Sequence, residues 1–431
     1  MIAYRAGAPI RAAQFFADVD RVAHALGGAR HVLNTCVDRY HFAVGFAATL
    51  CRGKVSLLPP AQTPEAVRQI VSLAPDVVCL TDEPEQELPL PRVLYPPDEA
   101  PGETAAATVP EIDAARHAAD VFTSGSTGTP LAHRKSWGGL TGGVREMARQ
   151  LGLSAQTPCV IVATVPPQHM FGLESSVLLA LCNGHALCAE RPFFPADIAA
   201  VLGSVPRPRL LITTPVHLRA LLAAEVALPP IDLIVSSTAP LAPQLALEAE
   251  QRFDTRVLEI YGSTETGAIA CRRPTHTLEW RSWPGIALSQ QGEATSVQGG
   301  HIEQPTRLPD LLEITASGRF LLHGRLTDLV NIAGKRSSLA YLNHQLNSIP
   351  GVEDGAFFQV DESRLAHTGV ARLAACVVAP QLDAPRLLEA LRRRIDAVFL
   401  PRPLLFVAQL PRNATGKLPA EALRALATAR G

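Results

Sequence analysis

The chain has 431 residues, of which 47% are hydrophobic, and its 39 basic and 40 acidic residues leave a formal net charge of −1. This balance argues against a nucleic-acid-binding protein, because such proteins are typically strongly basic. The longest apolar run, residues 42–51, is too short to span a bilayer, and the N-terminus has no continuous apolar segment of the signal-peptide kind. We therefore expect a globular cytoplasmic protein of two or three domains, with no nucleic acid and no membrane span.

Hydrophobic periodicity predicts strands that alternate with helices along most of the chain. Residues 65–81 indicate a helix followed by a buried strand, and residues 84–110, rich in Pro and acidic residues, indicate an exposed connector. Strand and helix patterns then recur over residues 158–190, 209–225, 231–241 and 245–267. Short strands rich in Val, Ile and Leu between helices are typical of a largely parallel sheet that helices cover on both faces.

The pattern changes at about residue 328. Residues 338–349 predict a short amphipathic helix, residues 371–380 a strand, and residues 385–399 another helix. The fold class we predict is therefore α/β: a large N-terminal domain with mostly parallel sheets covered by helices, followed by a small C-terminal α/β domain of about a hundred residues.

A loop of Ser, Thr and Gly follows a predicted strand at residues 123–128. Its hydroxyls and backbone N–H groups suit a phosphate chain, although a plain polar turn explains the loop equally well. It is not a Walker loop, because GxxxxGK[ST] occurs nowhere in the chain. The lysine that often accompanies a phosphate loop is missing, since Leu131 follows the proline. The chain has only four lysines, at positions 54, 135, 335 and 417, so each surviving lysine is a candidate for chemistry.

Three further motifs carry candidate chemistry. In YGSTETG, residues 261–267, Glu265 follows a strand beside hydroxyl groups, where a carboxylate can hold Mg²⁺ on a polyphosphate. Asp310 precedes Arg325 across a predicted hairpin, and this pair can bind a ribose and a nearby phosphate. RNATGK places Lys417 in a loop near the C-terminus. Taken singly, these residues are explained equally well as a solvated loop acid, a hairpin salt bridge and a solvated lysine.

In order and spacing, the four motifs together resemble the adenylate-forming superfamily of acyl- and aryl-CoA synthetases, carrier-protein-loading ligases and peptide synthetase adenylation domains. SSTAPL, residues 236–241, is similar to the superfamily's Gly-Ala-Pro segment beside the adenine and the acyl pocket. PPQHMFGLE, residues 166–174, is similar to the segment whose His or aromatic residue gates that pocket. The resemblance extends from about residue 118 to the C-terminus.

The resemblance implies an AMP-forming acid–thiol ligase with ATP and Mg²⁺ as cofactors. A small carboxylic acid, either an aryl acid such as a hydroxybenzoate or a fatty acid, would form an acyl-adenylate. The acyl group would then pass to the phosphopantetheine thiol of an acyl carrier protein, with CoA as the alternative acceptor. Two other classes stay open: a non-catalytic adenylate-binding protein, and a Ser-cisSer-Lys amidase, which would need a denser Gly/Ser loop. Release of pyrophosphate from ATP separates the ligase from both.

The resemblance also implies a role for individual residues. The catalytic group comprises Lys417, Thr264 and Glu265, of which Glu265 is the metal ligand. The ATP-binding group comprises Thr123, Ser124, Gly125, Ser126, Thr127, Gly128, Lys135, Tyr261, Gly262, Ser263, Asp310 and Arg325. The walls of the acid pocket are His169, Thr238 and Ala239. The hinge is Thr327 or Asp328, between an adenylate-forming domain, residues 1–326, and a mobile lid, residues 327–431, that carries Lys417.

The sequence departs from the superfamily pattern at two positions. Leu131 stands where relatives usually have a lysine, and we expect Lys135 or Arg134 to supply the missing charge to the phosphates. If so, Lys135→Ala raises the KM for ATP. Thr327 stands where many relatives have Asp, which leaves Thr327 and Asp328 as alternative hinge positions.

Overall fold

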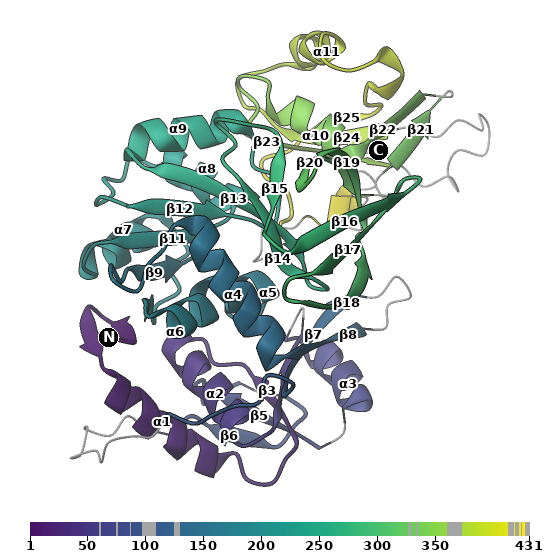
Figure 1. The fold of residues 1–431 in the computed structure, drawn as a ribbon. Coiled ribbons are helices and arrows are strands. Elements are labelled where there is room, and N and C mark those ends of the chain that lie inside the picture. The colour runs from purple at the N-terminus through teal and green to yellow at the C-terminus, as the bar shows by residue number, and fades with distance from the viewer. Residues whose placement is uncertain are drawn as a thin grey trace.

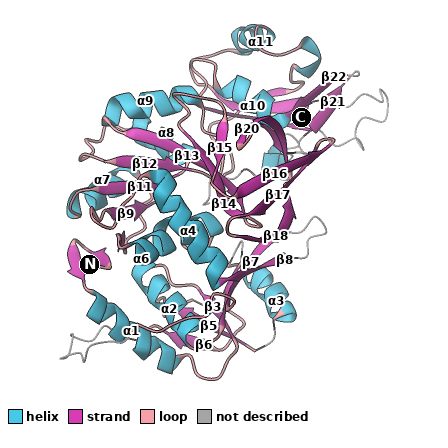
Figure 2. Cartoon of the chain, viewed as in Figure 1, coloured by secondary structure: helices cyan, strands magenta, loops and turns pink. Residues whose placement is uncertain are grey.

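The structure is a computed structural model that describes residues 1–59, 62–74, 76–86, 88–96, 109–124, 130–325, 329–332, 335–359, 373–412, 418, 422–423 and 425–426. Figure 1 shows α1 and α2 at one end of the molecule and α11 at the other end. In the view of Figure 2, the strands run through the middle of the molecule and helices flank them.

The largest sheet in the described ranges has eleven strands, in the order β19-β20-β15-β14-β13-β12-β11-β9-β10-β1-β2. Its strands are β1 (Ala3–Arg5), β2 (Ala8–Ile10), β9 (Val160–Ala163), β10 (Ala186–Cys188), β11 (Arg209–Thr213), β12 (Leu233–Ser236), β13 (Arg256–Ser263), β14 (Gly267–Arg272), β15 (Trp280–Ser282), β19 (Asp310–Ala316) and β20 (Arg319–Arg325). From β1 to β13 the neighbours are parallel, whereas β14, β15, β20 and β19 pair antiparallel. The predicted parallel sheet is thus confirmed and extended by an antiparallel half.

A second sheet of six described strands has the order β6-β5-β3-β4-β7-β8. Its strands are β3 (His31–Asn34), β4 (Val55–Leu58), β5 (Val77–Thr81), β6 (Arg92–Leu94), β7 (His117–Ser124) and β8 (Pro130–Ser136). All neighbours are parallel except β7 and β8, which form an antiparallel pair around the Ser/Thr/Gly loop. β6 lies inside the segment that we expected to be only a connector, because its backbone completes the edge beside β5.

Smaller sheets complete the strand set of the described residues. They contain β16 (Ile286–Gln291), β17 (Ala294–Gly299) and β18 (Ile302–Arg307); β21 (Leu329–Ile332) and β22 (Lys335–Ser338); and β23 (Asp354–Gln359), β24 (Leu373–Val378) and β25 (Leu404–Phe406). The helices are α1 (Ala12–Ala25), α2 (Arg39–Cys51), α3 (Pro64–Leu73), α4 (Trp137–Leu151), α5 (Met170–Gly172), α6 (Leu179–Asn183), α7 (Pro195–Ser204), α8 (Pro215–Ala223), α9 (Pro243–Phe253), α10 (Leu339–Asn347) and α11 (Ala384–Arg392), with a π-helical turn at Leu173–Leu178 and a 3₁₀ turn at Ala397–Phe399.

The main core lies between the two large sheets. Helices α2 and α4 contact both sheets, and their apolar residues join one cluster with those of α1 and α6. The opposite face of the eleven-stranded sheet packs against α7, α8 and α9, and α3 covers the outer face of the six-stranded sheet. Coverage on both faces explains why the parallel strands are continuously apolar.

The C-terminal elements have a core of their own. Apolar residues of β21, α10, β23, β24 and α11 form a separate cluster. Helix α10 begins where the hydroxyl of Ser338 accepts the N–H of Tyr341, and α11 begins where Asp383 accepts the N–H of Arg386. This separate cluster agrees with the predicted small α/β domain. The predicted boundary at residues 326 and 327, with the hinge residues Thr327 and Asp328, lies outside the described residues.

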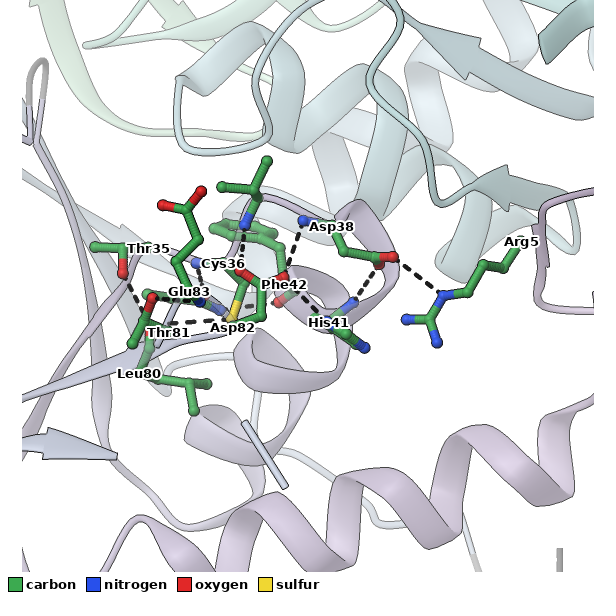
Figure 3. A network of polar contacts seen from close by, with 12 residues as sticks. Arg5, Thr35, Cys36, Asp38, His41, Phe42, Leu80, Thr81, Asp82 and Glu83 are labelled. Carbon is green, nitrogen blue, oxygen red and sulfur yellow. Dashed lines mark hydrogen bonds and ion pairs between the residues drawn. The ribbon is translucent and has the colours of Figure 1, made fainter. Parts of the chain in front are cut away.

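A polar network fixes the end of β3 and the start of α2 (Figure 3). The carboxylate of Asp82 accepts the backbone N–H groups of Val37 and Asp38, and lies 3.0 Å from Nδ1 of His41. Asp38 caps α2 by accepting the N–H of His41, and also accepts a hydrogen bond from Nε of Arg5 at 3.1 Å. These bonds hold the turn that contains Cys36, whose carbonyl accepts a hydrogen bond from the Gln168 side chain.

Candidate active site

The YGSTETG motif forms the end of β13, a tight turn and the start of β14. Ser263 pairs with Gly267 across the turn, and the hydroxyls of Ser263 and Thr266 lie 3.2 Å apart. A Cβ atom on Gly262 would lie 2.2 Å from the carbonyl oxygen of Gly267, so only glycine fits this close approach. The turn places Thr264 and Glu265 just beyond the carboxyl end of β13, next to the parallel part of the sheet.

The phosphate-loop candidate and Glu265 come together although they belong to different sheets. Thr123, in β7, has its hydroxyl 2.9 Å from Nε2 of His133 in β8. The same Nε2 lies 3.6 Å from Oε1 of Glu265. Ser124 ends β7, whereas Gly125, Ser126, Thr127 and Gly128 lie outside the described residues. The structure therefore brings the N-terminal edge of the predicted loop to the predicted metal ligand.

Lys135 lies at the Glu265 turn. Its Nζ donates a hydrogen bond of 2.6 Å to the backbone carbonyl of Glu265. Leu131, which replaces the usual lysine, is 58% exposed on the same strand and is not buried against this turn. The prediction that Lys135 binds phosphate stays untested, but the side chain does reach the site for which we predicted it.

The electrostatics of the turn favour an ionised Glu265. Burial opposes ionisation, but hydrogen bonding from Ser263 and from the backbone, and the nearby His133 and Lys135, together hold the pKa of Glu265 below its ordinary value. Burial also lowers the pKa values of His133 and Lys135. In the described residues, no group of three or more His, Cys, Asp or Glu side chains is arranged to hold a metal by itself. Mg²⁺ that arrives with ATP needs only one or two carboxylates in addition to phosphates, and Glu265 fits that requirement.

The ribose candidates lie on the β19–β20 hairpin, which β15 separates from β14 in the same sheet. Asp310, at the start of β19, is the direct cross-strand partner of Arg325 at the end of β20, which confirms the predicted hairpin. The hydroxyl of Tyr261 donates to Oδ2 of Asp310 at 2.7 Å. The ring of Tyr261 packs against Trp280 and Phe320, with centroids 5.6 and 5.5 Å away. Its predicted contact with adenine stays a prediction.

The acid-pocket candidates follow two parallel strands of the same sheet. His169 comes after β9 and immediately precedes α5, while Thr238 and Ala239 come after β12. Thr238 has a φ of +77°, a left-handed conformation that is strained for a β-branched residue. Because the carboxyl ends of parallel strands share one edge of a sheet, all three residues lie on the ligand-binding side that such sheets use.

Residues of α2 and of the turn before it support the segment that carries His169. The guanidinium of Arg39, fully buried, donates to the carbonyls of Ala163 and Val165 at 2.8 and 3.0 Å. Gln168 donates to the carbonyl of Cys36 at 2.8 Å. The start of α2 is thus tied to the backbone before the Pro-Pro turn, and the loop before α2 is tied to the Gln168 side chain after that turn.

A cavity of about 330 Å³ borders the Glu265 turn. Among its lining residues are Lys135, Met170, Glu174, Glu265, Thr266 and His301. The sequence interpretation missed His133, Glu174 and His301. A lone acid inside the apolar run MFGLESSVLLALC was a signal for Glu174, and His133 directly precedes Arg134 and Lys135, which we expected at the phosphates. Nothing in the sequence around His301 pointed to this site. Lys417 lies outside the described residues.

This α/β fold, with polar motif residues from both large sheets meeting at the Glu265 turn, is of the kind that nucleotide-binding enzymes use. The family model described as AMP-binding enzyme matches residues 6–292, which is more than half of the chain. The chain is also 34% identical over 305 residues to a 4-coumarate–CoA ligase of Rhodobacter capsulatus, covering 68% of this chain and 73% of that protein. The chain therefore belongs to the AMP-binding enzyme family, and the resemblance to the adenylate-forming superfamily is confirmed.

Two other comparisons agree with this assignment. A 4-coumarate–CoA ligase of Halorhodospira halophila is 29% identical over 319 residues, covering 71% of this chain and 76% of that protein. Crystalline ATP-bound MatB from Rhodopseudomonas palustris matches the fold with a TM-score of 0.83, at 20% identity, over 99% of this chain and 95% of that chain. The chain is thus an AMP-forming acid–thiol ligase that binds ATP. No helix within the described ranges is long and apolar enough to cross a membrane.

Proposed function

We propose that the chain activates an aryl carboxylic acid with ATP and transfers the aryl acyl group to the thiol of phosphopantetheine. In the first half-reaction, a carboxylate oxygen attacks the α-phosphorus and pyrophosphate leaves. In the second, a thiolate attacks the acyl carbon and AMP leaves. Two observations carry the proposal. Thr123 and Glu265 meet at His133, which suits phosphates and a metal, and Tyr261, in the strand that leads to Glu265, holds Asp310, which suits a ribose.

The residues divide the work between charge and position. Glu265 would hold the Mg²⁺ that neutralises the pyrophosphate, with Thr264 and the loop from Thr123 to Gly128 on the phosphates. Asp310, oriented by Tyr261, would bind the ribose hydroxyls. Lys417 would bridge the carboxylate and the α-phosphate. In such a reaction the transition state gains negative charge on the oxygens of the α-phosphate, so fixed cations and donors supply most of the catalysis.

The aryl class is supported by the names of the relatives, two of which are 4-coumarate–CoA ligases. The same names favour CoA as the acceptor, which the sequence interpretation held as its alternative to an acyl carrier protein. His169, Thr238 and Ala239 would form the walls of the acid pocket. The lid, residues 327–431, would rotate about Thr327 or Asp328 between the arrangement that forms the adenylate and the arrangement that forms the thioester.

The test is acid-dependent exchange of pyrophosphate into ATP with hydroxybenzoates, benzoate, cinnamates and short- to long-chain fatty acids. Exchange with an aryl acid supports the proposed class, and exchange with fatty acids alone contradicts it. The active acid is then incubated with ATP and either CoA or a phosphopantetheinylated carrier protein. The thiol that is converted to a thioester identifies the acceptor.

A further inference from the structure

Three side chains from separate elements hold the turn that carries Glu265. Lys135 of β8 donates to the carbonyl of Glu265 at 2.6 Å. His301, between β17 and β18, has Nε2 3.0 Å from the carbonyl of Thr266. Glu174, in the π-helical turn, accepts the N–H of Ala268 at 3.1 Å. Each of the three bonds goes to the backbone of residues 265–268, and none goes to the Glu265 carboxylate itself.

The Glu174 bond is buried and the bonds of Lys135 and His301 are partly buried, so the Glu174 bond is the costliest of the three to lose. Glu174 is 2% exposed, so its carboxylate depends on the Ala268 N–H and on the nearby positive charge of Lys135. His301 packs so closely on α4 that a Cβ atom on Gly143 would lie 3.1 Å from its ring. Because a carbonyl can only accept, the contact with Thr266 requires the proton on Nε2 of His301.

The local geometry leaves little room for the turn to move. Gly267 has a φ of +68°, and a Cβ atom there would lie 2.5 Å from Oε1 of Glu174. Inside the turn, the Ser263 and Thr266 side chains bond each other and the Ser263 and Thr266 N–H groups. Lys135, His301 and Glu174 therefore connect the Glu265 turn to three other elements. These elements are β8, the β17–β18 loop and the π-helical turn.

We propose that Lys135, Glu174 and His301 are positioning residues that fix the carboxylate of Glu265 for the Mg²⁺ that accompanies ATP. The inference rests on the proposed function. Side chains that orient a metal ligand affect metal affinity although they do not touch the metal. In this assignment Lys135 acts by holding the carbonyl of Glu265. This role differs from the one expected from the sequence, in which Lys135 contacts the phosphates in place of the lysine that is missing at Leu131.

The test compares Glu174→Leu and Glu174→Gln with Glu259→Gln. Glu259 is a matched control, because it is also 2% exposed and also accepts a backbone N–H, that of Leu241. It lies six residues before Glu265 and outside the turn. Three quantities are measured: the Mg²⁺ concentration for half-maximal pyrophosphate exchange, the calorimetric affinity for Mg·ATP, and the melting temperature. His301→Leu serves as an independent variant that removes a different bond to the same turn.

We expect Glu174→Leu and His301→Leu to raise the half-saturating Mg²⁺ concentration by about 10-fold. Glu174→Gln keeps an acceptor for the Ala268 N–H and should raise it less. Glu259→Gln should lower the melting temperature without this change. An unaltered Mg²⁺ requirement and Mg·ATP affinity in Glu174→Leu and His301→Leu, with only the melting temperature reduced, would overturn the inference. If the wild type exchanges with none of the aryl acids, the proposed function fails, while the Mg·ATP affinities still decide this inference.

Discussion

Tyr261 donates a hydrogen bond of 2.7 Å from its hydroxyl to Oδ2 of Asp310, and so joins the end of β13 to the first residue of β19. The ring is held by Trp280 and Phe320, which are themselves stacked with their planes 10° apart. An apolar cluster thus fixes the tyrosine, and the tyrosine fixes a carboxylate. Tyr261 therefore orients Asp310, the residue predicted to bind the ribose, from within the core.

Tyr261→Phe removes this hydrogen bond and leaves the ring packing intact. Because a hydrogen bond to a charged group contributes about 1.5–3 kcal/mol, we expect the KM for ATP to rise by about 10-fold if part of that energy orients Asp310. Tyr40→Phe is the matched control, since the Tyr40 hydroxyl donates to Asp18 at 2.6 Å in a different part of the domain. An equal KM for ATP in both variants would contradict the role of Tyr261.

Lys417→Ala should abolish most of the pyrophosphate exchange. The lysine is proposed to neutralise charge that develops on the α-phosphate, and removal of one such group costs about 100-fold or more in rate. Lys335→Ala provides the comparison, because Lys335 is in the same small domain and forms an exposed ion pair with Asp396. Similar rates for the two variants, measured at saturating ATP and acid, would exclude Lys417 from the chemistry.

Glu174 should make stability depend on pH. Burial raises the pKa of this carboxyl from 4.5 to about 7, against the opposing effects of Lys135 and the Ala268 N–H. Between these two values the folded state binds more protons than the unfolded state, so the free energy of unfolding falls as pH rises and levels off above about pH 7. The full effect is about 3 kcal/mol, and Glu174→Gln should remove it.

The measurement is urea denaturation of the wild type and of Glu174→Gln at intervals from about pH 5 to 8. The wild type should lose stability relative to the variant across this range. Parallel curves for the two proteins would show that Glu174 ionises at its ordinary pKa in the folded chain.

Thr238→Gly should stabilise the protein. Thr238 has a φ of +77°, where a β-branched residue stores about 1–3 kcal/mol, whereas glycine adopts this conformation freely but loses about 0.5–1 kcal/mol of chain entropy. We expect a net gain of about 1 kcal/mol in the free energy of unfolding. Asp254→Gly, at φ +46° after α9, is the control for the backbone effect. Only Thr238→Gly should also change the KM for the acid.

The motifs predicted which side chains lie near one another where the motif residues coincide with strand ends, whereas their roles stay predictions. Glu265, Tyr261 and Asp310 all lie at or just beyond the end of a strand, so their alignment in one site followed from a parallel sheet and one hairpin. The alternation of apolar strands and helices likewise predicted the sheet from β9 to β13, because local periodicity determines which face each residue buries.

The supporting residues could not be predicted in the same way. Glu174 and His301 meet the Glu265 turn through contacts across 94 and 35 residues of sequence, which no local pattern encodes. The edge strand β6 has only three residues, too few to show a period. Lys135 was found because lysine is rare in this chain, but its partner, a backbone carbonyl, depends on how the two large sheets pack.

Asp354 connects Arg412, which precedes the predicted catalytic Lys417 in the chain, to the large domain. Its carboxylate accepts two hydrogen bonds of 2.7 Å from Arg412, five residues before Lys417, and lies 3.7 Å from Arg219 of α8. Asp354→Asn should therefore displace the base of the lysine loop and lower the maximal rate of pyrophosphate exchange by about 10-fold, with little change in the KM for ATP, because small misplacements of a reacting group are costly.

Two comparisons separate this effect from a general loss of stability. Asp396→Asn removes an exposed ion pair in the same domain and should leave the exchange rate unchanged. Arg219→Ala removes only the link to α8, so it should reduce the rate less than Asp354→Asn does, which loses Arg412 as well. If Arg219→Ala is the slower of the two, the contact between α8 and β23 controls the rate instead of the anchoring of the loop by Arg412.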